Sequence, residues 1–223
     1  MRIFKVVLVV CTGVLCLILT ACEGDSVSSI TKSSPDFPNA VGDEWTYFYY
    51  DSLRFVSDTV HVSDTVDVRV TGFGQAPDGG QAKLWVYSYR HLKDSAGAAR
   101  VDTAYVTEVG DTIRMIRPQQ PSPITFVYPF TKGSSWTSGG GKPDTTTIVE
   151  VLTAFGIPIG QLRGVLHLER KWTEPAVTAE DSEIWLAPGF GLVAMRLNVV
   201  GLMPPAEAIT SEVWVMLSYR KAN

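Results

Sequence analysis

The stretch SDTVHVSDTVDVRV, residues 57–70, decides how the rest of the chain is interpreted. Its valines all fall on one parity of position: Val60, Val62, Val66, Val68 and Val70. Successive side chains of a β-strand point to opposite faces, so this spacing predicts a strand with one apolar face.

The same stretch contains an internal duplication. Residues 57–62 (SDTVHV) and 63–68 (SDTVDV) differ only at the fifth position. The pair is either one long strand with an even repeat or two short strands that meet at Ser63 and Asp64. Asp64 has the parity of the valines, so we expect a turn or bulge beside it.

The rest of the chain also predicts strands, in segments rich in Val, Ile, Thr, Tyr and Trp. The candidates after the first strands are 83–90, 101–108, 112–117, 124–128, 146–154, 162–172, 183–186, 192–199 and 212–219. Gly, Pro and Asp clusters separate them, and no stretch has a sustained apolar spacing of three and four; residues 204–208 offer one short helical turn at most. We therefore predict an all-β or β-rich fold with an antiparallel, strongly curved sheet, half-barrel or barrel-like.

The N-terminus has the pattern of a secretory signal. Arg2 and Lys5 precede the apolar run 6–19, which is shorter than the roughly 20 residues that a membrane-spanning helix needs. Residues 19–22, LTAC, resemble the lipobox of bacterial lipoproteins. That resemblance implies that residues 1–21 are removed and that the thiol of Cys22 is joined to diacylglycerol. The alternative is an ordinary signal peptide with a chance cysteine.

Cysteine count and charge limit the mature chain further. Two of the three cysteines lie in the predicted signal, which leaves Cys22 alone and excludes intrachain disulfides and multi-cysteine metal sites. The signal also removes two of the 19 basic residues and none of the 23 acidic ones, for a net charge of −6. Nucleic acid and an anionic membrane face are therefore not expected as partners.

The domain organisation follows from composition. Residues 22–36 are Ser-rich and nearly free of large apolar groups, so we expect a flexible tether, followed by a single β-rich domain over 37–223. Residues 37–46 (FPNAVGDEWT) and 128–137 (YPFTKGSSWT) share an aromatic-Pro-x-x-x-Gly-x-x-Trp-Thr pattern 91 positions apart. The pattern marks either two related halves, 37–127 and 128–223, or two unrelated loops with similar turn chemistry.

Four segments carry a wider family resemblance: FPNAVGDEWTY (37–47), YPFTKGSSWT (128–137), FGIPIGQLRGVLHLE (155–169) and EIWLAPGFGLVAMRL (183–197). They are similar to a group of bacterial envelope lipoproteins with Phe-Pro-x-x-x-Gly-x-x-Trp and Ala-Pro-Gly-x-Gly-Leu-Val motifs. The resemblance implies a β-rich half-barrel-like domain, loosely similar to carriers that shuttle lipoproteins across the periplasm. The group has no agreed catalytic residues to carry over.

Motifs for catalysis or cofactors are weak. GFGLVA (189–194) fits a dinucleotide-binding pattern in its letters, but a strand rather than a helix is expected to follow it. His61, His91 and His167 have no partner at metal-ligand spacing. We therefore expect no catalytic residue, no metal site and no cofactor.

Aromatic residues are the most informative class. Trp45 and Tyr47 share one strand face, and Trp85 and Tyr87 share another. These four residues are the candidate ligand-binding positions, on a concave apolar surface. The alternative is ordinary core packing between strands.

The resulting functional hypothesis is a non-enzymatic binding module. It would be held in the bacterial cell envelope, at the outer membrane, by the lipid on Cys22. Its partners would be the membrane, through that anchor, and an apolar ligand or an envelope protein. The alternative is a structural subunit of an envelope assembly.

Overall fold

The computed structural model describes residues 37–54, 59–117, 123–138, 144–174, 178–203 and 206–222. The predicted signal 1–21, the lipidation site Cys22 and the tether 22–36 lie outside these ranges. Their assignments stay predictions.

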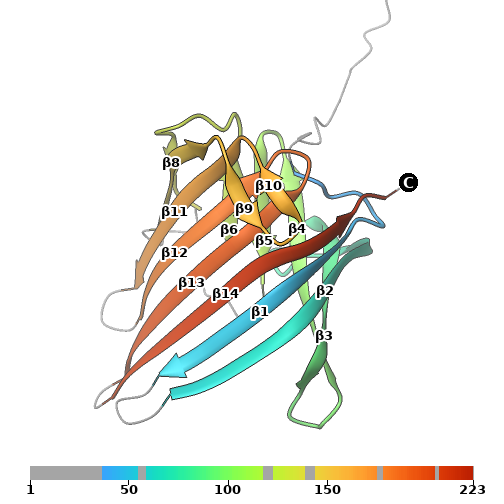
Figure 1. Ribbon diagram of the computed structural model, residues 1–223, viewed down its shortest axis with the longest axis vertical. Coiled ribbons are helices and arrows are strands. Elements are labelled where there is room, and N and C mark those ends of the chain that lie inside the picture. The colour runs from blue at the N-terminus through green and yellow to red at the C-terminus, as the bar shows by residue number, and fades with distance from the viewer. Residues whose placement is uncertain are drawn as a thin grey trace, which may run out of the picture. The chain divides into compact units, whose positions relative to one another are not determined.

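The described residues form fourteen strands and no helix (Figure 1). Accordingly, they include no helix long and apolar enough to cross a bilayer. The strands are β1 (Glu44–Arg54), β2 (Thr59–Gln75), β3 (Gln81–Lys93), β4 (Ala99–Val109), β5 (Thr112–Ile116), β6 (Ile124–Val127), β7 (Ser135–Trp136), β8 (Asp144–Leu152), β9 (Phe155–Ile157), β10 (Gly160–Leu162), β11 (Val165–Glu174), β12 (Thr178–Ala187), β13 (Gly191–Met203) and β14 (Ala206–Arg220).

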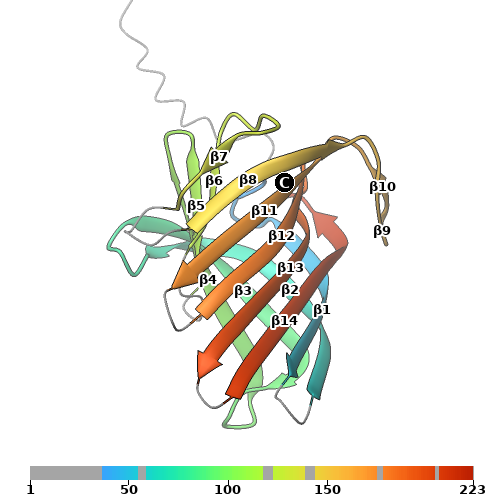
Figure 2. The ribbon, with the colours of Figure 1, turned by 90° about the vertical axis from the view of Figure 1, so that its left-hand side faces the viewer.

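Twelve of these strands make one antiparallel sheet in the order β6-β5-β4-β3-β2-β1-β14-β13-β12-β11-β8-β7. The sheet curls until it is nearly closed into a barrel, and its edge strands β6 and β7 are neighbours along the chain (Figure 2). Long strands with a right-handed twist coil in this way when one face is apolar. The predicted all-β, antiparallel, barrel-like fold is confirmed.

Strand β2 runs without a break through residues 59–68 of the duplicated stretch. Its register with β1 runs without a shift through Asp64, so the expected turn or bulge there is wrong. Asp64 instead points inward and is buried, where its carboxylate accepts hydrogen bonds from the amides of His91 and Leu92. Those bonds offset the cost of burying the charge. The register shift in β2 falls further on, between Val70 and Gly72.

The two FPNAVGDEWT-like segments fold into the same turn. In the first, the amide of Gly42 donates to the carbonyl of Val70 at 2.8 Å. In the second, the amide of Gly133 donates to the carbonyl of Ile148, also at 2.8 Å. Both glycines have positive φ, 100° and 84°, which side chains with a Cβ rarely adopt.

The match extends to the flanking bonds. Asp43 donates to Ala40 and Ser134 donates to Thr131, at 2.9 Å in each case. The turn chemistry is therefore shared in detail. Descent of the two halves, 37–127 and 128–223, from one unit remains a proposal.

The core lies on the inner face of the curled sheet. Alternate residues of each long strand point into it, and the most completely buried large side chains include Trp45, Trp85, Ile148, Leu168 and Met216. Aromatic rings, valines and methionines fill this interior, so the barrel centre is a packed core rather than a channel.

Candidate functional site

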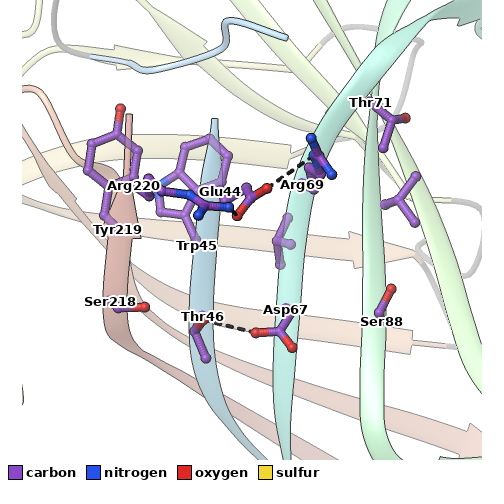
Figure 3. Close-up of a pocket in the computed structure, with 12 residues that line it drawn as sticks. Glu44, Trp45, Thr46, Asp67, Arg69, Thr71, Ser88, Ser218, Tyr219 and Arg220 are labelled. Atoms are coloured by element: carbon purple, nitrogen blue, oxygen red, sulfur yellow. Dashed lines mark hydrogen bonds and ion pairs between the residues drawn. The ribbon is translucent and has the colours of Figure 1, made fainter. Parts of the chain in front are cut away.

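A groove of about 500 Å³ crosses the outer face of β14, β1, β2 and β3 (Figure 3). Short side chains, Thr46 and Ser218 among them, form its floor, and long charged side chains border it. Glu44 lies between two cations: Arg69 at 3.1 Å, and Arg220, with which it also pairs. The groove is thus a polar surface whose charges already have partners.

Asp67 completes the polar network of the groove. It accepts hydrogen bonds from the hydroxyl of Thr46 and from Arg90, both at 2.9 Å. The hydrogen bond from Arg90 is the largest cause of a lowered pKa of the Asp67 carboxyl. Exposed ion pairs of this kind contribute little to stability, so the fold does not depend on the charged side chains of the groove.

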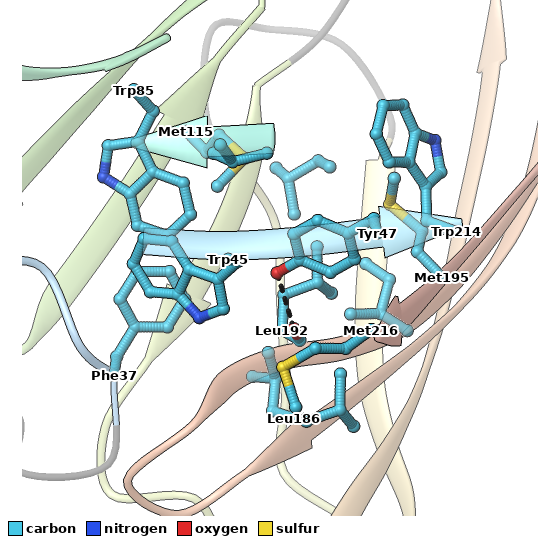
Figure 4. Packing of buried hydrophobic residues seen from close by; sticks show 14 of the residues in the cluster. Phe37, Trp45, Tyr47, Trp85, Met115, Leu186, Leu192, Met195, Trp214 and Met216 are labelled. Atoms are coloured by element: carbon cyan, nitrogen blue, oxygen red, sulfur yellow. Dashed lines mark hydrogen bonds between the residues drawn. The ribbon is translucent and has the colours of Figure 1, made fainter. Parts of the chain in front are cut away.

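The four predicted ligand-binding aromatics lie on the inner face, two on β1 and two on β3, and β2 separates these strands. Figure 4 shows Trp45, Tyr47 and Trp85. Trp45, Tyr47, Trp85 and Tyr87 are exposed by only 1%, 2%, 0% and 5%. The rings of Trp45 and Trp85 stack with centroids 4.5 Å apart. The structure therefore brings the four residues together in the core, where their own rings pack against one another.

The polar atoms of Trp45 and Tyr47 also have hydrogen-bond partners within the protein. The indole of Trp45 donates to the carbonyl of Phe190 at 2.9 Å, and the hydroxyl of Tyr47 donates to the carbonyl of Leu192 at 2.8 Å. Burial is the main cause of a raised pKa of the Tyr47 hydroxyl, which therefore stays protonated. These are the contacts of core packing; a ligand-binding role for the four residues stays a prediction.

An apolar recess of about 310 Å³ opens at one end of the barrel. Three segments that lie far apart in sequence surround it. Its lining consists of Tyr128, Pro129, Phe130, Gly164, Leu166, Leu186, Ala187 and Pro188. The volume is at the lower end of the range for small-molecule sites, and the lining is the apolar type that such sites have.

Local sequence explains how the recess is held open. The turn after β12 contains Pro188, and the loop after β6 contains Pro129, so two stiff segments face each other over the buried side chains of Leu166 and Leu186. The rings of Tyr128 and Phe130 lie 3.9 Å apart on one side.

The recess lies at the end of the domain where the described chain begins. Phe37 packs on Phe126, just before the loop of the recess, with ring centroids 5.5 Å apart. Pro38 lies against Gly191, just after the turn that holds Pro188: a Cβ added to Gly191 would meet its ring at 3.1 Å. The described chain therefore begins beside the recess.

Sequence reasoning missed the recess residues as a site. Six of the eight lining residues come from YPF (128–130) and LAP (186–188), whose proline-containing sequences indicate turns, and the other two are Gly164 and Leu166. Residues 164–166 and 186–188 meet through the pairing of β11 with β12, in which Leu166 and Leu186 are register partners. No spacing rule shows that residues 128–130 join them, because closure of the sheet brings the end of β6 there.

The histidines do not gather. His61 contacts the hydroxyl of Tyr50, His91 pairs with Asp64 at 2.8 Å, and His167 lies 3.4 Å from Glu183. Across the residues that the structure places, no three His, Cys, Asp or Glu side chains form a group that could hold a metal ion.

Comparison with solved structures finds distant likenesses. No family model and no curated protein matches the chain. A crystal structure described as a "putative lipoprotein" of Parabacteroides distasonis ATCC 8503 aligns with a TM-score of 0.41 and 14% identity, over 82% of this chain and 97% of that one. The motif-based family resemblance stays a prediction.

Proposed function

We propose that this protein is a non-enzymatic envelope lipoprotein, anchored through the acylated thiol of Cys22, whose barrel holds an apolar chain in the recess beside its tether. The single observation that carries the proposal is the apolar recess of about 310 Å³. The aromatic and aliphatic side chains in the middle of the inner face are buried against one another, whereas the recess is an open hollow with an apolar lining.

Geometry supports a link between anchor and recess. Cys22 precedes Phe37 by fifteen positions, and a flexible segment of that length reaches about 20 Å. A strand such as β14, with fifteen residues, spans roughly 50 Å. The end of the barrel that carries the recess is therefore the end that the anchor would hold near the lipid surface, where a chain can transfer at short range.

Binding is tested with N-phenyl-1-naphthylamine, an uncharged apolar dye whose fluorescence rises in an apolar site. Phe130→Asp and Pro188→Asp each place a charge at the rim of the recess, so both should weaken dye binding at least tenfold. Ile159→Asp changes an exposed side chain in the β9–β10 turn and is the matched control. Equal dye binding by all four proteins would exclude the recess as the site.

Anchoring is tested separately. Cys22→Ser should release the protein from membranes into the soluble fraction without changing dye binding by the purified protein. A Cys22→Ser protein that still partitions with the membrane would overturn the anchor and leave the recess untouched.

A structural subunit of an envelope assembly is the second candidate function. The observation in its favour is the outer groove of about 500 Å³, which is larger than the recess and bordered by Glu44, Arg69 and Arg220. Under this alternative, Glu44→Lys would abolish reproducible co-purification of envelope proteins, whereas Phe130→Asp would not.

A further inference from the structure

The inner face carries a group of charges at the end of the barrel opposite to the recess. We call it the inner charged cluster, and it consists of Asp51, Arg100, Asp102, Arg117 and Glu212. The cluster continues the aromatic stripes: Asp51 follows Tyr49 two positions along β1, so both side chains point inward. Solvent reaches it, since the side chains of Arg100 and Glu212 are 34% and 23% exposed.

Two carboxylates of the cluster face each other directly. Asp51 of β1 and Glu212 of β14 are register partners in adjacent antiparallel strands. Like charges at such positions destabilise a sheet. Burial first, and then the charge of Glu212, raise the pKa of the Asp51 carboxyl, and these effects outweigh the opposite effects of a hydrogen bond with Tyr49 and of the charge of Arg100.

The cations of the cluster are already engaged. Arg100 donates to Asp102 through Nε at 3.1 Å and through Nη2 at 2.9 Å, and its guanidinium lies 4.5 Å from the ring centre of Tyr89. Arg117 lies 3.7 Å from Glu212. The cluster thus has three carboxyl groups against two guanidiniums, and Asp51 is the carboxyl that takes no part in these two ion pairs.

Two buried polar atoms of this region have no hydrogen-bond partner among the residues that the structure describes: Oδ1 of Asp51 and the hydroxyl of Tyr89. Tyr89 is 97% buried (3% exposed). Its hydroxyl faces the cluster, because Arg117, Arg100, Asp102 and Glu212 all act on its ionisation. A buried polar atom without a hydrogen-bond partner lowers the stability of the fold. A ligand that binds at the cluster would supply the missing partners.

We propose that the inner charged cluster binds an organic ammonium group, which Asp51 and Glu212 hold between them. A protonated amine supplies the missing positive charge and up to three N–H donors for the unpaired oxygens. The site is separate from the apolar recess and does not depend on it. The amine can come from a small diamine or from a lysine side chain of a partner.

Isothermal titration calorimetry at pH 7 tests the site on the purified full-length protein. The probes are 1,4-diaminobutane, acetyl-Gly-Lys-Gly-amide and, as the uncharged control, 1,4-butanediol. We expect saturable binding of at least one amine and none of the diol. Binding of the diamine alone indicates a small amine as the source, and binding of the peptide alone indicates a partner's lysine.

Three variants complete the test. Asp51→Asn and Glu212→Gln should each weaken amine binding at least tenfold, whereas Asp181→Asn, an exposed residue of β12, should leave it unchanged. Asp51→Asn should also melt no lower than the wild type, because it relieves a like-charge contact. Failure of both amines to bind, unchanged binding by Asp51→Asn, or a clear fall in its melting temperature would each overturn the proposal.

Discussion

The indole nitrogen of Trp136 donates a hydrogen bond of 2.7 Å to the carbonyl oxygen of Thr125. Trp136 ends β7 and Thr125 lies in β6, so this bond joins the two edge strands of the twelve-stranded sheet. A side chain thus bridges the gap that backbone pairing leaves open. Unpaired edges are a route to aggregation, and this contact covers one of them.

Trp136→Phe should therefore weaken the contact between the edge strands β6 and β7 (the seam) while keeping an aromatic ring in place. We expect a loss of about 1 kcal/mol in the free energy of unfolding, the usual contribution of one hydrogen bond. Trp45→Phe, at the equivalent position of the duplicated turn, should cost more because Trp45 is only 1% exposed and its loss leaves a cavity. Urea denaturation of both variants measures the difference; a larger loss for Trp136→Phe would contradict this ranking.

Trp85→Ala separates core packing from ligand binding for the aromatic stripes. Trp85 is fully buried, stacks on Trp45 and donates to the side chain of Asn39 at 2.7 Å. We expect a loss of about 3–5 kcal/mol in unfolding free energy. Calorimetry that shows an unchanged melting temperature would instead favour a binding role for the stripes.

A buried ion pair supports the seam from the inside. Arg170 lies 3.3 Å from Asp144, with side chains 0% and 1% exposed, and Arg170 also reaches the carbonyl of Pro123 next to β6. Asp144→Ala should cost about 3–5 kcal/mol, because it leaves a buried guanidinium without its carboxylate. The double variant Asp144→Ala/Arg170→Met should recover part of that loss in urea unfolding. A double variant no more stable than Asp144→Ala would show that the charge on Arg170 is not the cause.

Asp64 gives the fold a pH dependence. Burial raises the pKa of its carboxyl, but hydrogen bonds from the amides of Leu92 and His91 outweigh this and leave the pKa lowered. A carboxyl with a lowered folded-state pKa stabilises above its unfolded pKa, about 3.9, and loses that contribution as the pH falls through the folded pKa. Asp64→Asn should be less stable than the wild type by about 2 kcal/mol at pH 7, given the strength of hydrogen bonds to a charged group.

That difference should shrink as the pH falls below about 4, since the carboxyl of the unfolded wild type then takes up a proton and that of the folded protein does so at lower pH. Thermal unfolding of the two proteins between pH 7 and pH 3 measures it. A constant difference across this range would mean that the charge on Asp64 does not stabilise the fold.

The alternation of apolar residues predicts the antiparallel, barrel-like sheet, but it gives strands that are too short where they extend past the apolar core. The pattern predicted a strand over 183–186, and β12 runs from Thr178 to Ala187. Similarly, a strand over 212–219 was expected, and β14 begins at Ala206, where a short helical turn had been allowed. Past the apolar core, both faces of a strand can be polar, so the periodic signal disappears while backbone pairing continues.

The candidate sites depend on closure of the sheet, which no local pattern encodes. Asp51 and Glu212 are opposite each other only because β1 pairs with β14. Phe130 and Leu186 border one recess only because the edge strands meet. Inward-facing residues could be predicted from parity, but which of them meet could not.

The most direct test of the proposed binding function is native mass spectrometry of the acylated full-length protein, released from a bacterial membrane in mild detergent. The account predicts a non-covalent apolar adduct on the wild type and on Ile159→Asp, and its loss from Phe130→Asp. A bare protein mass in all three, or the same adduct on Phe130→Asp, would contradict it.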